Sequence, residues 1–174
     1  MTKWQPTIGV FAGIFNEHGE LLIKRRVFEE KTFVGDWDLP GGAIEAEAAA
    51  KAIDEGLIGQ ELAREVEEET GIKLLALQRM PAMYPAVVAS GKDLAVAIII
   101  GVVKSKPAMG QYAYVSPNEL WMISRRSEGN RLVSGWGKRM CRLCLRIFAS
   151  RDCPNGAYRN QAARMLKDIQ EGVE

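Results

Sequence analysis

A charged run near the middle of the chain, residues 64–72, has residue types and a spacing suited to metal chemistry. Five of its nine residues are charged, and four of those five are acidic. On a helix, which turns about 100° per residue, four acids of this region share an arc of about 100°. They are Glu61, Glu65, Glu68 and Glu69. Mg²⁺ prefers such oxygen ligands together with substrate phosphates. The pattern predicts a carboxylate site for Mg²⁺, and a solvated acidic helix face is the alternative.

The cost of placing like charges together supports a bound cation. Like charges three and four residues apart destabilise an isolated helix by about 0.2–0.5 kcal/mol per pair. A cation against that face would reverse the sign of this contribution. Clustered carboxylates also disfavour each other's ionisation, which favours a general base among them. Glu65 is the first candidate for that base.

A helix must present these acids. Ile58, Leu62 and Val66 recur at helical spacing beside them. A helix is therefore predicted over 58–70, with Gly71 as its C-terminal cap. The apolar stripe would pack on the rest of the protein and leave the acids at its border.

The remaining chain predicts a mixed sheet with helices packed on its faces. Runs rich in β-branched and aromatic residues predict strands at 7–15, 20–26, 72–80, 93–104 and 111–115. A short strand over 38–42 is predicted to run into a tight Pro-Gly-Gly turn, where two glycines let the backbone approach a ligand. The capping pattern from Ser116 to Glu119 starts a helix. Two further helices are predicted over about 134–170.

We expect one α/β domain over 1–174, with the Ala-rich stretch at about 45–55 as a short helical insertion. The formal net charge of +1 predicts neither nucleic-acid nor membrane binding. The longest apolar run, residues 94–103, is too short to span a bilayer. The N-terminus lacks the pattern of a secretory signal, so a cytoplasmic protein is expected.

The three cysteines are expected in the core. Cys141 and Cys144 lie at helical spacing among apolar residues, and Cys153 follows nine positions later. A structural zinc site would need a fourth ligand, and the one histidine, His18, lies far away in a predicted exposed turn. An odd, sparse count also argues against a disulfide framework.

Three stretches of the sequence resemble the Nudix family. Residues 64–72, Arg-Glu-Val-Glu-Glu-Glu-Thr-Gly-Ile, resemble the core of the Nudix box, G-x5-E-x7-R-E-U-x-E-E-x-G-U, where U is aliphatic. Residues 35–42 are similar to the approach to that box. Residues 112–120 are similar to the strand-to-helix passage late in the fold. The resemblance extends over about residues 7–148.

The resemblance implies a Nudix fold, an α/β/α sandwich around a mixed sheet, here with extra C-terminal helices. It also implies hydrolysis of a diphosphate linkage in a nucleoside diphosphate derivative, with Mg²⁺ or Mn²⁺ as cofactor. By the family pattern, Glu65, Glu68 and Glu69 hold the metal together with the backbone carbonyl of Gly41. Arg64 orients the glutamates and partly balances their charge, so the implied catalytic set is Arg64, Glu65 and Glu68.

The chain departs from the family pattern inside the box. Gly42 and Arg64 are 22 positions apart (64 − 42), eight more than in the pattern. The Ala-rich stretch is where the extra residues are expected. Counting back from Arg64 places the first glutamate of the box at Gly56. Glu55, through a one-residue bulge, and Glu61, one turn before the core, are the two candidates to replace it.

The sequence gives only weak signals for further residues that bind the metal or the substrate. Some family members use a further acid before the last strands, and this chain has no Asp or Glu between Asp93 and Glu119. Asp93 is the nearest candidate. Arg25 and Arg26 end the second predicted strand and are candidates to contact substrate phosphates. A solvated strand end is the alternative.

Two functions stay open. The first is a hydrolase that acts on a sugar nucleotide, a dinucleotide or a nucleoside triphosphate. The second is a Nudix-fold nucleotide-binding or regulatory module, weakened by the missing glutamate. The intact Arg-Glu-Val-x-Glu-Glu core favours the hydrolase. Either function implies a nucleotide-type small molecule as partner, and the sequence leaves a homodimer open.

Overall fold

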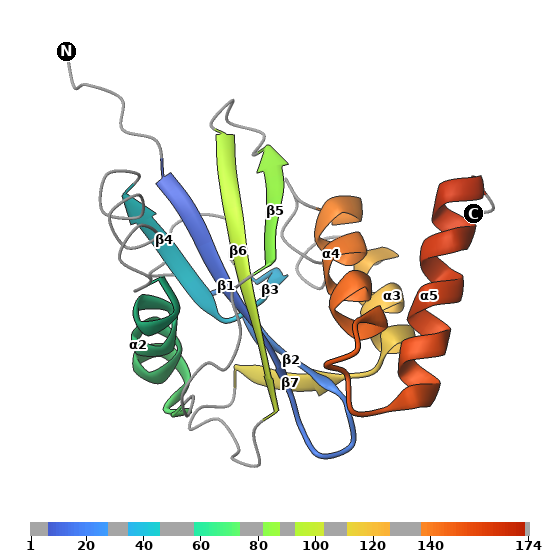
Figure 1. Cartoon of the computed structure of the whole chain (residues 1–174), viewed down its shortest axis with the longest axis horizontal. Helices are drawn as coiled ribbons and strands as arrows, with labels where there is room; N and C mark the ends of the chain where they lie inside the picture. The colour runs from blue at the N-terminus through green and yellow to red at the C-terminus, as the bar shows by residue number, and fades with distance from the viewer. Residues whose placement is uncertain are drawn as a thin grey trace.

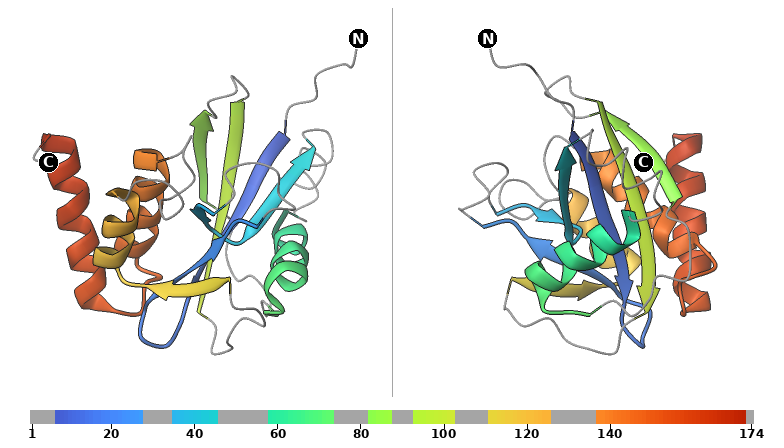
Figure 2. Two further views of the ribbon diagram at one scale, coloured as in Figure 1. Left: turned by 180° about the vertical axis from the view of Figure 1, so that it is seen from behind. Right: turned by 60° about the vertical axis from the view of Figure 1, so that its left-hand side comes forward.

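The protein is a sheet with helices on both faces (Figures 1 and 2). The computed structural model describes residues 7–27, 35–45, 58–73, 82–87, 93–102, 111–125 and 137–172. One helix, α2 (Ile58–Thr70), covers one face of the sheet. Three helices lie on the other side, namely α3 (Pro117–Arg125), α4 (Gly137–Ala149) and α5 (Gly156–Glu171). This arrangement confirms the predicted α/β class with a mixed sheet.

The sheet has seven strands in the described part of the chain. They are β1 (Thr7–Phe15), β2 (Leu21–Arg25), β3 (Trp37–Asp38), β4 (Gly41–Glu45), β5 (Ala82–Val87), β6 (Asp93–Val102) and β7 (Tyr112–Val115). Their main order is β3-β2-β1-β6-β5, while β4 also pairs with β1 and β7 with β2. β1 runs parallel to β6, and the other pairs are antiparallel. β1 is therefore the strand around which the sheet is assembled.

Several predicted elements are confirmed with their bounds. The strand over 7–15 and the helix over 58–70 have the predicted ends. Gly71 ends that helix with φ 71°, the left-handed conformation that favours glycine. At the start of α3, the Ser116 N–H and hydroxyl donate to the Glu119 carboxylate, and the Glu119 N–H donates back to Ser116 Oγ. The predicted capping box is therefore present.

Other expectations differ from the structure. Sequence analysis missed β5, because Pro85 interrupts its pattern; the strand lies at the end of the main strand order, where proline is tolerated. Residues 71–73 are not in a strand, and the rest of the strand predicted over 72–80 lies outside the described residues. Gly41 and Gly42 begin β4 instead of only forming a turn. Of the predicted insertion, Glu45 ends β4, and the remainder lies outside the described residues.

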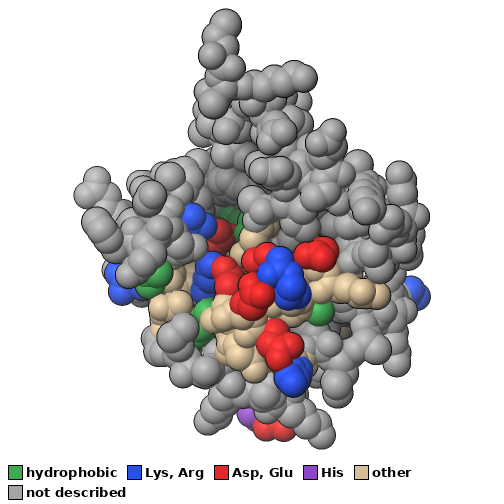
Figure 3. All heavy atoms as spheres, turned by 90° about the vertical axis from the view of Figure 1, so that its left-hand side faces the viewer, with side chains coloured by type: hydrophobic (Ala, Val, Ile, Leu, Met, Phe, Trp, Pro, Cys, Tyr) green, Lys and Arg blue, Asp and Glu red, His purple; other side chains and the backbone are tan. Residues whose placement is uncertain are grey.

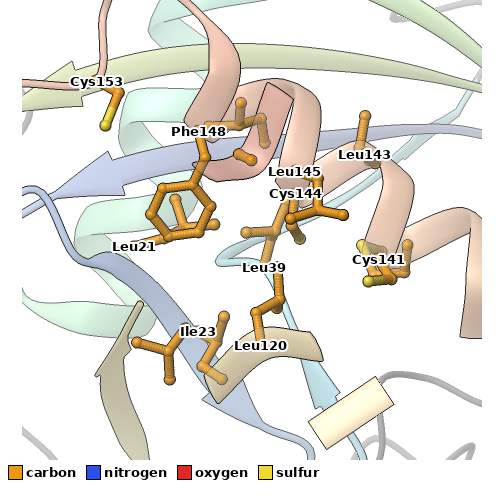
Figure 4. Close-up of a cluster of buried hydrophobic side chains, with 14 of the residues drawn as sticks. Leu21, Ile23, Leu39, Leu120, Cys141, Leu143, Cys144, Leu145, Phe148 and Cys153 are labelled. Atoms are coloured by element: carbon orange, nitrogen blue, oxygen red, sulfur yellow. The ribbon is translucent and has the colours of Figure 1, made fainter. Parts of the chain in front are cut away.

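The larger core lies between the sheet and α3, α4 and α5 (Figure 4). Successive strand residues point to opposite faces, so Leu21 and Ile23 enter this core while Leu22 points toward α2. The ring of Phe148 in α4 lies 5.6 Å from that of Phe15 in β1 and packs edge-on against Tyr158 of α5. Aromatic contacts thus join the sheet, α4 and α5 into one packed unit.

The cysteines contribute to this core, as predicted. Cys141, Cys144 and Cys153 are buried and carry free thiols. Burial raises the pKa of the Cys144 thiol well above its ordinary value, which keeps it protonated. His18 lies in the exposed turn between β1 and β2, as predicted. None of the described helices has the length and apolar character that crossing a membrane requires.

Candidate active site

Helix α2 presents the acidic residues at the edge of the sheet. Leu62 and Val66 are buried and pack the helix onto the sheet, whereas the side chains of Glu65, Glu68 and Glu69 are 26%, 59% and 25% exposed. Thr70 closes the helix, because its hydroxyl donates to the Val66 carbonyl and accepts the Ile72 N–H. The apolar stripe read from the sequence therefore fixes which face of α2 carries the charges.

Arg64 contacts three acids of α2, and Figure 3 shows Lys and Arg side chains in blue among the red Asp and Glu side chains of this face. Its Nη1 donates to both carboxylate oxygens of Glu68 at 2.8 Å. Its Nη2 donates to Glu65 at 2.5 Å, and its Nε donates to Glu61 at 3.3 Å. The hydrogen bonds to Glu68 first, then those to Glu61 and Glu65, raise the pKa of the guanidinium above its ordinary value. One permanent cation thus holds three carboxylates together.

Glu69 is held by three different strands. Lys24 of β2 donates through Nζ to its Oε1 at 2.5 Å, and the Gly41 N–H of β4 donates to its Oε2 at 2.9 Å. The Tyr112 hydroxyl of β7 donates to the Glu69 backbone carbonyl. These contacts fix both the carboxylate and the backbone of the last helical turn.

Gly42 allows the closest approach between α2 and β4. A Cβ placed on Gly42 would lie 2.8 Å from Oε2 of Glu65 and 3.2 Å from its Cδ. Any side chain at this position would therefore push the Glu65 carboxylate away. The two consecutive glycines affect different carboxylates. The Gly41 N–H donates a hydrogen bond to Glu69, and the missing side chain of Gly42 leaves space for Glu65.

A polar row crosses the sheet beneath these glutamates. Lys24 faces Tyr112 on one neighbouring strand and Asp38 on the other. Asp38 is buried, accepts the Leu39 N–H at 2.8 Å and pairs with Arg26 at 3.1 Å. Burial raises the pKa of Asp38 to about 6, against the opposing effects of the Leu39 N–H and of the Arg26 and Lys24 charges.

A family model for the NUDIX domain matches residues 3–133 of the chain. The chain belongs to the Nudix hydrolase family. The match covers the sheet, α2 and α3, so helices α4 and α5 lie beyond it. No curated protein sequence matches the chain.

Solved Nudix structures share the fold. A NUDIX hydrolase from Nitrosomonas europaea has a TM-score of 0.55 at 20% identity, with 82% of this chain and 88% of that chain covered. The NUDIX domain of Shewanella oneidensis NrtR, complexed with ADP ribose, has a TM-score of 0.54 at 17% identity, covering 80% and 85%. An ADP-ribose pyrophosphatase from Streptococcus suis has a TM-score of 0.52 at 20% identity, covering 84% and 94%. At these identities the likeness concerns the fold alone.

The residues of this Nudix domain have the chemistry that a hard divalent ion requires. Carboxylates and a backbone carbonyl are the oxygen ligands that Mg²⁺ prefers, and the space above Gly42 already accommodates the Glu65 carboxylate. Among the side chains that the structure describes, no group of three acids, histidines or cysteines is already arranged to hold a metal ion. The carboxylates of Glu65 and Glu68 instead contact Arg64, and the carboxylate of Glu69 contacts Lys24. The ligand types fit a metal, while protein cations hold the acids in this conformation.

Several candidate residues make other contacts or lie outside the described part. Arg25 donates through Nε to the Gly35 carbonyl at 3.0 Å, and Arg26 binds Asp38. Glu61 contacts Arg64. The remaining candidates are outside the described side chains, namely Glu55, Gly56 and Asp93.

Sequence analysis gave no role to Lys24 or Asp38, and it considered Tyr112 only as a candidate to stack on a base. Lys24 did leave a signal, because it follows three apolar residues, shares a face with Leu22 and so should point inward. An inward lysine needs an anionic partner. The identity of that partner, 45 positions along the chain, could not be read from the strand itself.

Proposed function

We propose that this Nudix domain hydrolyses a diphosphate linkage in a nucleoside diphosphate derivative with the help of Mg²⁺ or Mn²⁺. One observation carries the proposal. Two glutamates of the Nudix box, Glu65 and Glu69, lie beside the glycine pair that opens β4, and Arg64 links Glu65 to Glu68. Acids grouped in this way can share a cation with the phosphates of a substrate.

The residues divide the work. Glu65, Glu68, Glu69 and the Gly41 carbonyl would hold the metal, which when bound stabilises charge on phosphate oxygens and makes a coordinated water more acidic. Glu65 is the candidate to accept the proton of the attacking water. Its carboxylate, fixed by Arg64 and by the close contact with Gly42, needs little reorganisation to do so.

Arg64 balances the charge of this cluster. It binds Glu68 and Glu65 at once, and so keeps two carboxylates oriented that would otherwise repel each other. Its own charge is permanent, because hydrogen bonds to three acids raise its pKa further. We assign it the orienting role in catalysis.

The substrate is a nucleotide with a further group on its diphosphate. Sugar nucleotides, dinucleotides and nucleoside triphosphates stay the candidate classes. Fold relatives that bind or cleave ADP-ribose place that compound first among the substrates to test. Arg25 and Arg26 both stay candidates for a phosphate contact; Arg25 donates to the Gly35 carbonyl, and Arg26 binds the buried Asp38. A cytoplasmic location and a homodimer stay predictions.

A second function, a nucleotide-binding or regulatory module, has one observation in its favour. Gly56 stands where the family pattern has the first glutamate of the box. If neither Glu55 nor Glu61 replaces that acid, binding would persist while turnover is lost. Glu61 contacts Arg64, as Glu65 and Glu68 do, and Glu55 lies outside the described residues, so both stay candidates to replace that acid.

One experiment separates the two functions. Phosphate and nucleotide products would be measured for ADP-ribose, other sugar nucleotides, dinucleotides and nucleoside triphosphates, with Mg²⁺, with Mn²⁺ and with chelator. Glu68→Gln should remove the activity, by about 10²-fold or more, and leave the fold intact. Glu67→Gln is the matched control, because Glu67 lies on the same helix, pairs with Lys73 at 3.5 Å and occupies a variable position of the box.

The outcomes are distinct. Metal-dependent turnover of one class that Glu68→Gln loses and Glu67→Gln keeps would support the hydrolase and name its substrate. Saturable nucleotide binding without turnover across the panel would support the regulatory module. Full activity of Glu68→Gln with unchanged metal dependence would contradict the site assignment.

A further inference from the structure

We propose that Lys24 is an internal counter-cation of the metal site, which pairs with Glu69 and lowers the affinity of the site for a divalent cation. The inference rests on the proposed function, because it takes Glu69 as a metal ligand. Lys24 lies outside the Nudix box, 45 positions before its partner. Its contribution comes from the sheet and not from the helix that carries the box.

The contact geometry gives Lys24 a strong hold on Glu69. Its ammonium lies 2.5 Å from Oε1, and only 7% of its side chain is exposed. The Gly41 N–H binds the other oxygen at 2.9 Å. Each carboxylate oxygen has two acceptor positions, so Glu69 can still bind a cation, but it would have to share its charge with Lys24.

The surroundings keep Lys24 in place. It faces Tyr112 and Asp38 on its two neighbouring strands, and Tyr112 binds the backbone of the same glutamate. Asp38 is in turn paired with Arg26. A buried lysine between the partly exposed Glu69 and the buried Asp38 gains little by leaving, since its charge would lose both partners.

Two effects of Lys24 on metal binding have opposite signs. Hydrogen bonds that fix a ligand raise metal affinity, and their loss typically costs 10–100-fold. A positive charge a few ångströms from a divalent cation repels it, by about tenfold in affinity even with the full screening of water, and by more in a partly buried site.

The repulsion should win here. Glu69 would keep the Gly41 N–H and its backbone contact with Tyr112 if Lys24 were replaced, so most of its positioning would survive. The positive charge beside it would be gone. Lys24 therefore makes the site favour a cation that arrives together with the negative phosphates of a nucleotide, which offset the lysine charge.

Three substitutions separate charge from hydrogen bonding. Lys24→Gln keeps a donor and removes the charge, Lys24→Met removes both, and Lys24→Arg keeps both. Mn²⁺ binding to the nucleotide-free protein would be measured from the electron paramagnetic resonance signal of free Mn²⁺. We expect Lys24→Gln to bind Mn²⁺ about tenfold more tightly than the wild type and Lys24→Arg to bind it as the wild type does.

Lys167→Gln is the matched control for these measurements. Lys167 pairs with Glu171 at 3.7 Å on α5, an exposed lysine–glutamate pair on the other side of the sheet. Its replacement makes the same change in net charge and should leave Mn²⁺ binding unchanged. A tighter binding in both variants would show a general charge effect and overturn the specific role of Lys24.

Other outcomes decide the remaining cases. Unchanged or weaker Mn²⁺ binding by folded Lys24→Gln would overturn the counter-cation role and leave Lys24 as a structural support of Glu69. If the wild type binds no Mn²⁺, with or without a nucleotide, the proposed function fails instead. If the neutral variants do not fold, the wild-type protein with isotope-labelled lysine would be used instead. Addition of Mg²⁺ should shift the side-chain NMR signal of Lys24 and leave that of Lys167 unshifted. An unshifted Lys24 signal would overturn the proposal.

Discussion

The two faces of the sheet are stabilised by different forces. On the α2 side, carboxylates of the helix are paired with Arg64 and Lys24, and a buried Asp38 is paired with Arg26. On the α4 side, the buried residues are aromatic, aliphatic and sulfur-containing side chains. On the α2 side, Leu62 and Val66 pack the helix onto the sheet, and ion pairs and backbone hydrogen bonds position its carboxylates. On the α4 side, apolar packing positions the buried side chains. The strands between them carry alternating residues, so one sheet serves both.

The two sides of the sheet are therefore expected to govern different properties, namely activity on the α2 side and stability on the α4 side. A buried aromatic ring contributes through the apolar area that it removes from water, with little dependence on pH. Paired charges contribute little net stability, because desolvation opposes their attraction, but they fix positions closely. Substitutions on the α4 side should therefore change the free energy of unfolding at any pH, and substitutions on the α2 side should change activity or the pH dependence of stability.

The largest expected effect is on the packed face. Phe148→Ala removes a fully buried ring that contacts Phe15 and Tyr158, and should lower the free energy of unfolding by about 3–5 kcal/mol. Denaturant unfolding would measure it, with Phe148→Leu as a milder control. The activity of the protein that remains folded should be unchanged. An activity loss as large as that of Glu68→Gln would break the comparison between the faces.

The next effect is a pH dependence that belongs to the α2 side. Burial raises the pKa of Asp38 to about 6 from an ordinary value of 3.8. The folded protein then holds the proton more tightly than the unfolded chain, so this contribution to stability is present below pH 4 and is lost as the pH rises through about 6. Its size is at most about 3 kcal/mol.

Asp38→Asn tests this pH dependence. Unfolding free energies of the wild type and the variant would be compared from pH 4 to pH 7. The contributions of the other carboxylates to the pH dependence then cancel in the difference between the two proteins. The wild type should lose stability relative to the variant across this range. A constant difference between the two proteins, or one of opposite sign, would contradict the predicted proton binding at Asp38.

Gly42→Ala should affect activity more than stability. The new Cβ would lie 2.8 Å from Oε2 of Glu65, and the flexible end of that side chain would move away at small cost. A displaced general base should lower kcat by about 10–100-fold. Gly156→Ala is the control, because its Cβ would make an ordinary contact of 3.7 Å with Arg159. Equal effects of the two alanines on kcat would argue against the role of Gly42.

The smallest expected effect concerns the hydrogen bonds by which Asn155 caps α5 and joins it to the turn between β1 and β2. Asn155 caps α5 by accepting the N–H groups of Ala157 and Tyr158, and its Nδ2 donates to the His18 carbonyl at 2.9 Å. Asn155→Ala should lower the unfolding free energy by about 0.5–2 kcal/mol without a change in activity. Asn160→Ala, on the exposed surface of the same helix, should have little effect. A reduced kcat for Asn155→Ala would show that contacts on the α4 side of the sheet also affect catalysis.

Much of the local structure could be predicted from sequence. The helix over 58–70 and the capping box at Ser116 depend on residues three and four positions apart, and those relations are fixed once a helix forms. The pairs of Arg64 with Glu61 and with Glu68 are of the same kind. Strand β5 escaped prediction, because Pro85 is acceptable only at the edge position that the assembled sheet gives it.

The sequence by itself determined the family, the acidic helix and the residues of its charged face, because a motif and a helical period are both local. Only the tertiary structure decided what holds Glu69. Lys24, Gly41 and Tyr112 meet it from three strands that are separated from it by 45, 28 and 43 positions. Strand order and register bring them together, and neither follows from the residues around any one of them. The charge balance of the site is therefore a property of the folded sheet.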